Sequence, residues 1–284
     1  MALKGKPRML PNFLIIGSQK SGTTSLYHVL RQHPQIFMPD RKEVNFFFLD
    51  QEYRRGSQYY QDYFDPAPPQ TAALGEASPG YICHPDVPAR IHQLLPQAKL
   101  ILTVRNPIER AYSQYWDNRR SLSEYLTFAE VVDLALEPTY HPARLGYFSR
   151  GTYIQYIQRY LAFFPPENLL ILPFDDLRHS PASFYRRIYQ FLGVDPDFHT
   201  PAMTTSFNPA AIWHNPLYQW FFSKPARARW LPAKLRRLTF FGPRTPWQYP
   251  PMEATLRQKL VDFYRPWNAR LGEFLDRDLS IWDS

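Results

Sequence analysis

The sequence predicts an α/β fold in which a P-loop-like, doubly wound parallel sheet is flanked by helices. Short apolar runs alternate with amphipathic helical segments along most of the chain, which is the order of a parallel sheet with helical crossovers. The run Lys99 to Val104 is almost continuously apolar and rich in β-branched residues, as expected for a strand that is covered on both faces. A glycine-bounded loop, Gly17 to Gly22, joins the first predicted strand to the first predicted helix.

The predicted elements follow from the apolar runs and the residues that end them. The run Asn12 to Ile16 predicts the first strand, and Thr23 to Gln32 predicts a helix that ends at His33-Pro34. Further strands are predicted at Leu74 to Ser78, Lys99 to Val104 and Leu169 to Pro173. Further helices are predicted at Val87 to Leu95, Asn106 to Arg120, Tyr153 to Phe164, Pro181 to Leu192, Glu253 to Tyr264 and near Leu271.

Length and composition set limits on the class of protein. The chain has 284 residues, enough for one large α/β domain, and we expect a single domain over residues 1–284. Its formal net charge of +8 favours anionic partners, although arginine on a solvated face would give the same total. A single cysteine, Cys83, excludes an internal disulfide and argues against a cysteine-based metal site. No apolar run is long enough for a signal sequence or a transmembrane segment, so we expect a cytoplasmic protein.

The segment from Thr200 to Pro251 differs in composition from the rest of the chain. It carries many prolines, four of the chain's seven tryptophans and the basic run Arg227 to Arg237. The four tryptophans are Trp213, Trp220, Trp230 and Trp247. We interpret the segment as an irregular lid or acceptor-facing excursion of the single domain.

The loop from Gly17 to Ser25 has the pattern of a phosphate-binding loop with one change. A Walker A loop places a lysine after its second glycine, whereas that position is Thr23 here and the lysine lies inside the loop at Lys20. The backbone N–H groups and the helix N-terminus favour an anion. Four hydroxyl side chains follow, those of Ser21, Thr23, Thr24 and Ser25. The alternative is an ordinary strand-to-helix turn.

The segment Pro11 to Leu26 resembles the 5′-phosphosulfate loop of sulfotransferases that use 3′-phosphoadenosine 5′-phosphosulfate (PAPS). It is most similar to the branch that contains the heparan sulfate sulfotransferases and their bacterial relatives. The resemblance implies PAPS as sulfuryl donor and Lys20 as the catalytic lysine at the bridging oxygen, where a cation stabilises the leaving group. We expect no metal, because the sequence shows neither a Walker B acidic strand nor a cluster of metal ligands. It implies a donor site formed by Lys20, Ser21, Gly22, Thr23, Thr24 and Ser25.

A second motif, Lys99 to Tyr115, resembles the 3′-phosphate segment of the same family. The resemblance implies that Arg105 and Ser113 hold the 3′-phosphate, and Arg105 follows a strand end, where open α/β sheets bind ligands. Taken singly, Arg105 could be a surface ion-pair partner and Ser113 a hydroxyl bonded to its own helix. The family's basic C-terminal segment has no clear counterpart, and Arg150 or Gly242 to Arg244 are candidates for its place.

Similar segments extend over most of the chain, and the similarity is weakest between Thr200 and Pro251. They are Glu76 to Tyr81, Arg150 to Tyr153, Leu169 to Leu177, Phe191 to Val194 and the tail Asn268 to Trp282.

The segment Arg41 to Phe47 resembles the Lys-Glu-x-x-Phe-Phe segment of the heparan sulfate branch, which implies Glu43 as the general base. The alternative is that Glu43 is a solvated carboxylate beside Lys42. The chain departs from this branch at two positions. Asn45 stands where some members have a histidine two residues after the glutamate, and Ala77 stands where they have a lysine after the glutamate of the second strand. These differences argue against carrying over the polysaccharide substrate. Histidines compete for the role of base: His28, His84 and His214, of which His84 is the more plausible.

The sequence therefore predicts a nucleotide-binding transferase, a PAPS-dependent sulfotransferase that acts on a hydroxyl or amine of a small-molecule, glycan or carrier-bound acceptor. One rival is a P-loop kinase or hydrolase, which the placement of Lys20 disfavours. The other is a non-catalytic module that binds anionic glycan. We expect no nucleic-acid partner, because no DNA- or RNA-binding signature is present.

Overall fold

The computed structural model describes residues 9–121, 123–136, 146–205, 207, 211–213, 244–246 and 248–283. The chain divides into two compact units. We call Met1–Arg105 with Ile154–Phe207 the sheet unit, and Asn106–Tyr153 with Asn208–Ser284 the helical unit. The expectation of one domain over the whole chain stays a prediction.

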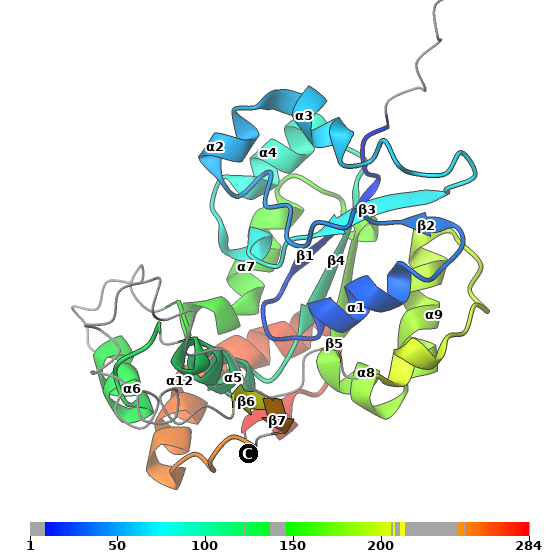
Figure 1. Ribbon diagram of the computed structural model, residues 1–284. Coiled ribbons are helices and arrows are strands. Elements are labelled where there is room, and N and C mark those ends of the chain that lie inside the picture. The colour runs from blue at the N-terminus through cyan, green and yellow to red at the C-terminus, as the bar shows by residue number, and fades with distance from the viewer. Residues whose placement is uncertain are drawn as a thin grey trace, which may run out of the picture. The chain divides into compact units, whose positions relative to one another are not determined.

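The sheet unit contains a parallel sheet with the strand order β2-β3-β1-β4-β5 (Figure 1). The bounds are Phe13–Gly17 for β1, Ile36–Phe37 for β2, Ala73–Ala77 for β3, Lys99–Val104 for β4 and Leu169–Pro173 for β5. The chain builds one half of the sheet on the β3 side of β1 and then crosses to β4 on its other side. The order therefore reverses beside β1, and such a switch point is where doubly wound sheets bind ligands. The predicted fold class is confirmed.

Helices cover both faces of this sheet (Figure 1). On one face, α1 (Thr23–Leu30) and α9 (Pro181–Leu192) pack against Phe13 and Ile15 of β1 in a single apolar cluster. On the other side lie α4 (Val87–Leu94) and α7 (Tyr153–Leu161), the second of which starts at the last residue assigned to the helical unit. Shorter helices complete the unit: α2 (Asp50–Tyr53), α3 (Gly56–Asp62), α8 (Phe174–His179), and the 3₁₀ turns η1 (Tyr81–Cys83), η3 (Pro166–Asn168) and η4 (Pro201–Thr204).

The helical unit packs three helices around an aromatic core. They are α5 (Pro107–Arg120), α6 (Phe128–Leu136) and α12 (Ala254–Leu275). Their apolar faces share one cluster, which includes Ile108, Val131 and Tyr264. The described residues of this unit also form short elements: the 3₁₀ turns η2 (Ser149–Gly151) and η6 (Ser280–Asp283), and the antiparallel strands β6 (Ala211–Trp213) and β7 (Arg244–Pro246).

One predicted boundary near the C-terminus is wrong. We expected a helix from Glu253 to Tyr264 and a separate short helix near Leu271, whereas α12 runs continuously through Pro266. A proline inside a helix costs about 3 kcal/mol. Here Pro266 is on the exposed face, while the buried face continues in phase from Tyr264 to Asn268 and Leu271. Burial of that face outweighs the lost backbone hydrogen bond.

Most of the expected excursion from Thr200 to Pro251 lies outside the described residues, including Trp220, Trp230, Trp247 and the run Arg227 to Arg237. Its interpretation as a lid stays a prediction. Among the described residues, no helix is both long enough and apolar enough to cross a membrane. The cytoplasmic location likewise stays a prediction. Within the same residues, no group of three or more His, Cys, Asp or Glu side chains is placed to hold a metal ion.

Candidate active site

The loop between β1 and α1 is fastened to the neighbouring strand β4 where it begins. The backbone N–H and the hydroxyl of Ser18 both donate to the carbonyl oxygen of Thr103, each at 2.9 Å. The Thr103 hydroxyl donates back to the Gly17 carbonyl oxygen at 3.1 Å. The Ser21 hydroxyl lies 2.7 Å from the Ser18 hydroxyl oxygen and, like it, is buried. The loop is therefore held in one conformation by hydrogen bonds to the sheet.

Two residues of this loop have left-handed backbone conformations. Lys20 has φ 70° and Gly22 has φ 85°. Gly22 is also closely packed, because a Cβ added there would lie 2.7 Å from Cε2 of Phe174. Both the conformation and the contact exclude a larger residue at this point.

Helix α1 begins directly after Gly22 and presents an anion-binding end. The N–H groups of a first helical turn have no partner inside the helix. In α1 no side chain caps them, and the first turn contains no acidic residue. The positive end of the helix is therefore free of a built-in counter-charge, which is the arrangement that binds phosphate or sulfate groups.

Arg105 lies beside this loop, after the last residue of β4. Its Nη1 atom donates to the carbonyl oxygen of Lys20 at 3.1 Å. Its guanidinium carbon lies 5.4 Å from the centre of the Phe174 ring, which also packs against Gly22. The two sequence motifs thus meet in space in the sheet unit.

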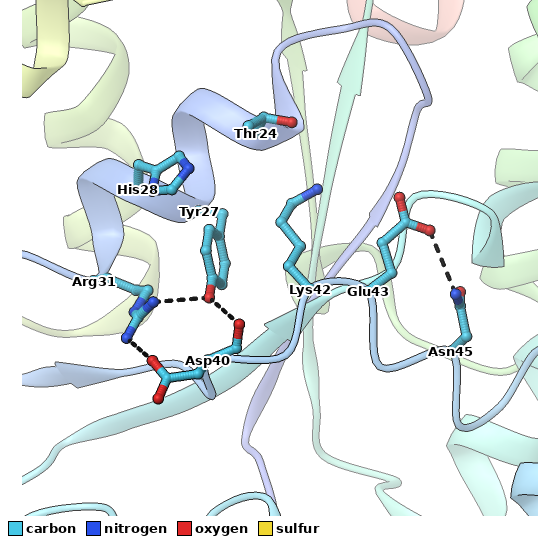
Figure 2. Close-up of a pocket in the computed structure, with 8 residues that line it drawn as sticks. All are labelled: Thr24, Tyr27, His28, Arg31, Asp40, Lys42, Glu43 and Asn45. Carbon is cyan, nitrogen blue, oxygen red and sulfur yellow. Dashed lines mark hydrogen bonds and ion pairs between the residues drawn. The ribbon is translucent and has the colours of Figure 1, made fainter. Parts of the chain in front are cut away.

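A pocket of about 530 Å³ opens along α1 (Figure 2). It is lined by Thr24, Tyr27, His28, Arg31, Asp40, Lys42, Glu43 and Asn45. Of the residues that sequence analysis assigned to the site, Thr24 and Glu43 lie here. Lys20, Ser21 and Gly22 belong to the adjoining loop, and Thr23 and Ser25 to the first turn of α1; none of the five is among the lining residues. The structure therefore joins the predicted base to the helix that follows the phosphate-type loop.

Tyr27 attaches the far wall of the pocket to α1 (Figure 2). The single hydrogen of its hydroxyl is shared between the carbonyl oxygens of Pro39 and Asp40, at 2.7 and 3.1 Å, and the hydroxyl oxygen accepts from Arg31 at 2.9 Å. Arg31 also forms an ion pair with the carboxylate of Asp40. Sequence analysis did not assign these residues, although the helical spacing of Thr24, Tyr27 and Arg31 is a signal that they share one side of α1.

Lys42 and Glu43 follow Asp40 on the segment that faces α1 across the pocket, and their side chains extend in the same direction (Figure 2). Burial lowers the pKa of Lys42, while the carboxylates of Glu43 and Glu76 act in the opposite sense. The side-chain amide of Asn45 donates to Oε2 of Glu43 across a long 3.5 Å. A half-buried carboxylate beside a cation is able to take a proton from a substrate held in the pocket.

The histidines proposed as alternative bases occupy different places. His28 lines the pocket, where its ring stacks on Phe207 with centroids 4.5 Å apart. Burial, followed by the charges of Arg31 and Lys42, lowers the pKa of His28 and favours its neutral form. His84 is not among the lining residues, and its Nδ1 atom accepts the backbone N–H of Asp86 at 3.2 Å. His214 lies outside the described residues.

The remaining predicted donor contacts belong to the helical unit. Ser113 is buried on α5, and its hydroxyl oxygen lies 3.2 Å from that of Tyr249, a residue that sequence analysis did not assign. Arg150 lies in η2. Gly242 lies outside the described residues, and Arg244 begins β7. The roles of Ser113 and Arg150 stay predictions.

Comparisons with known proteins identify the family of the chain. The sulfotransferase domain family matches residues 10–208. The chain is 32% identical over 279 residues to the bifunctional heparan sulfate N-deacetylase/N-sulfotransferase 3 of Mus musculus, and 32% identical over 282 residues to the protein of the same name from Homo sapiens. Both alignments cover 94% of this chain but 30% of the relative, so the chain spans about a third of these proteins.

A solved structure extends the similarity to the whole chain. The sulfotransferase from Alicyclobacillus acidocaldarius superposes with a TM-score of 0.72 at 28% identity, and the match covers 97% of this chain and 100% of that one. The chain therefore belongs to the sulfotransferase family and is a sulfotransferase, in a family that uses PAPS as its general donor.

Proposed function

We propose that the protein transfers the sulfuryl group of PAPS to a hydroxyl or amine of a polar acceptor bound in the pocket of Figure 2. The observation that carries this proposal is that Glu43 and Thr24 line one pocket. Thr24 belongs to the first turn of α1, whose uncapped N-terminus suits an anionic donor. This supports Glu43 as the proposed base, because its carboxylate lines the same pocket as the end of the helix where the donor's sulfate and phosphate would bind.

Each residue then has a definite part in the reaction. The acceptor atom forms a new bond to sulfur, and the bond from sulfur to the bridging oxygen breaks, leaving its electron pair on the 5′-phosphate. Glu43 takes the acceptor's proton as general base. Lys20 stabilises the negative charge that develops on the bridging oxygen. No residue has to change its oxidation state, and no metal takes part in this scheme.

The donor site is proposed to combine the loop with the second motif. Lys20, Ser21, Gly22, Thr23, Thr24 and Ser25 bind the 5′-phosphosulfate through side chains and backbone N–H groups. Arg105 binds the 3′-phosphate, to which its planar guanidinium can donate two parallel hydrogen bonds. Ser113 and Arg150 are proposed as supplementary donor contacts, and each is to be tested by its own substitution.

The acceptor is proposed to be polar, because the pocket is lined by Arg31, Asp40, Lys42, Glu43 and Asn45 as well as by α1. The curated relatives are named as N-sulfotransferases of heparan sulfate, and a sugar amine is therefore the first acceptor to test. The resemblance to the heparan sulfate branch departs at Asn45 and Ala77, so a small or carrier-bound sugar is an equal candidate.

Calorimetric titration with 3′-phosphoadenosine 5′-phosphate, the product nucleotide, tests the donor site. The titration is made without and with magnesium, beside ATP, and with the variants Arg105→Ala and Arg178→Ala. The second is a matched control, because Arg178 is an exposed arginine of the same unit. Tight binding that is much weaker for ATP and is lost only in Arg105→Ala would support the proposal. Equal, magnesium-dependent binding of ATP would overturn it in favour of a kinase or hydrolase.

A further inference from the structure

We propose that Glu76 is a positioning residue of the transfer site, whose carboxylate orders the segment that carries Lys42 and Glu43. It acts through two hydroxyl groups, those of Ser78 and Tyr81, and does not itself touch the substrate. The inference rests on the proposed function, in which Glu43 is the base.

Glu76 is a fully enclosed carboxylate in β3, with 1% of its surface exposed. Its Oε2 atom accepts the hydroxyl of Ser78 at 2.7 Å, and its Oε1 atom accepts that of Tyr81 at 2.6 Å. The hydroxyl of Tyr60 is a third, longer donor to Oε1 at 3.3 Å. A buried charge is tolerated only where such hydrogen bonds replace water.

The same two hydroxyl groups hold the backbone of the segment that follows Glu43. The N–H of Asn45 donates to the Ser78 hydroxyl oxygen at 2.9 Å, and the N–H of Phe47 donates to the Tyr81 hydroxyl oxygen at 3.3 Å. A hydroxyl has one hydrogen to donate. Because each of these hydrogens goes to Glu76, each oxygen faces the N–H with a lone pair. One carboxylate thus sets the direction of both contacts.

Asn45 connects the backbone that Ser78 holds to the carboxylate of Glu43, the proposed base. Residues 42–49 form neither helix nor strand. The N–H groups of Phe48 and Leu49 donate to the Asn45 carbonyl oxygen and close a turn, whereas the N–H of Asn45 itself depends on the Ser78 hydroxyl. Asn45 adopts a left-handed conformation with φ 57°, which costs free energy unless local contacts hold it. Its side-chain amide is the group that donates to Glu43. Loosening the Asn45 backbone would therefore displace the carboxylate that takes the proton.

The ionisation of Glu76 decides whether both contacts are kept. Four titratable groups face it: Tyr60 from α3, Tyr81 from η1, and Lys42 and Glu43 from the ordered segment. Burial raises the pKa of Glu76 to about 7, although its hydroxyl donors act to lower it. The ionised carboxylate accepts from both hydroxyls, whereas the protonated acid must donate at one oxygen and so opposes one contact. Order in the segment is therefore lost as the pH falls below about 7.

The test compares Glu76→Gln and Ser78→Ala with Tyr60→Phe. Tyr60 bonds the same carboxylate but is not one of the two hydroxyls that hold the backbone of Asn45 and Phe47, so its variant is the matched control. The first readout is release of 3′-phosphoadenosine 5′-phosphate from PAPS across pH 5.5 to 9, with chitosan oligosaccharides or water alone as acceptor. We expect kcat to fall by about 10- to 100-fold in Glu76→Gln at pH 8, as for a misplaced catalytic group, with product-nucleotide affinity unchanged.

The pH profile separates positioning from a purely structural role. In the wild type and in Tyr60→Phe, kcat should fall as the pH drops below about 7. This fall, the acid limb of the profile, should be absent in Glu76→Gln. Ser78→Ala, which breaks one of the two contacts, should lower kcat less than Glu76→Gln. Full kcat with an unchanged acid limb in Glu76→Gln would overturn the inference.

A second readout, amide hydrogen exchange at Asn45 and Phe47, depends on neither acceptor nor turnover. Exchange should be faster in Glu76→Gln than in Tyr60→Phe, and equal rates would also overturn the inference. If Glu76→Gln does not fold, Ser78→Ala decides by the same two readouts. Failure of the wild type to bind the product nucleotide would instead count against the proposed function.

Discussion

Arg105 donates a hydrogen bond to the carbonyl oxygen of Lys20, a residue 85 positions earlier in the chain, across 3.1 Å. This contact joins the end of β4 to the loop after β1, at the point where the order of the sheet reverses. The Phe174 ring contacts both sides of this junction, because it lies under the Arg105 guanidinium and packs against Gly22 of the loop. A change in Arg105 is therefore expected to disturb the loop as well as the nucleotide contact.

Replacing Arg105 should weaken binding of the product nucleotide. Hydrogen bonds to a charged group contribute about 1.5–3 kcal/mol, so Arg105→Ala should raise the dissociation constant by about 10- to 100-fold. Arg105→Lys should recover only part of this, because an ammonium group cannot make two parallel hydrogen bonds to a phosphate. Titration calorimetry measures both variants beside Arg178→Ala. Full affinity in Arg105→Lys would show that charge alone, without the guanidinium geometry, is what matters.

Replacing Lys20 should affect turnover more than donor binding. The proposed contact is to the bridging oxygen, whose charge grows only as the bond to sulfur breaks. Lys20→Ala should lower kcat by about 10²- to 10³-fold, as for loss of one group that stabilises a developing negative charge. Product-nucleotide affinity should fall by much less, and single-turnover kinetics separates the two effects. Collapse of binding with normal turnover of the remaining complex would contradict this role.

Replacing Glu43 should remove transfer and leave the donor site intact. A general base contributes about 10²- to 10⁴-fold, so Glu43→Gln should lower kcat within that range at unchanged product-nucleotide affinity. His28→Gln is the informative companion, since His28 lines the same pocket, and His84→Gln is the control outside it. Retained activity in Glu43→Gln together with its loss in His28→Gln would transfer the role of base to the histidine.

Glu76 should also affect how the free energy of unfolding depends on pH. Its pKa in the folded protein is about 7, above the ordinary value of 4.5, so the native state binds the proton more tightly than the unfolded chain. The contribution of the bound proton to the free energy of unfolding is fully present below pH 4.5 and is lost as the pH rises to about 7. Its upper bound is about 3 kcal/mol. Thermal unfolding of Glu76→Gln should therefore depend less on pH between 4.5 and 7 than that of the wild type. Parallel curves for the two proteins would contradict the raised pKa.

Strands with a strong local signal were predictable from sequence. β4 and β5 have the bounds that the apolar runs Lys99 to Val104 and Leu169 to Pro173 indicate, since parallel strands covered by helices on both faces are apolar along their length, even for β5 at the edge of the sheet. β2 was not predicted, because Ile36–Phe37 is too short to show a pattern and exists through its pairing with β3. The continuation of α12 through Pro266 likewise depends on packing, which a local rule for proline does not include.

The site was predictable as separate motifs but not as an arrangement. Glycine spacing locates the loop, and a resemblance points to Glu43, yet neither shows that Glu43 and Thr24 share a pocket. The hydrogen bond from the backbone N–H of Asn45 to the hydroxyl of Ser78, a residue 33 positions later, has no signal in the sequence. Contacts of this kind depend on how β3 is placed in the sheet, so only the folded chain shows them.

Gly22 and Gly56 offer a test of the loop in which the backbone conformation is matched. Both are left-handed, with φ 85° and 82°, but an added Cβ meets the Phe174 ring at Gly22 and nothing within 4 Å at Gly56. Alanine should cost about 1–2 kcal/mol at each site through its conformation, and a further 1–3 kcal/mol at Gly22 through the clash. Thermal unfolding should therefore shift further in Gly22→Ala.

The two glycine variants should also differ in nucleotide binding. To admit the new methyl group in Gly22→Ala, Phe174 must move, and the Arg105 guanidinium that lies over its ring must move with it. Product-nucleotide affinity should then fall in Gly22→Ala and stay unchanged in Gly56→Ala. Equal destabilisation with intact binding in both variants would show that the loop tolerates a displaced Phe174, and that Arg105 holds its position through Lys20 alone.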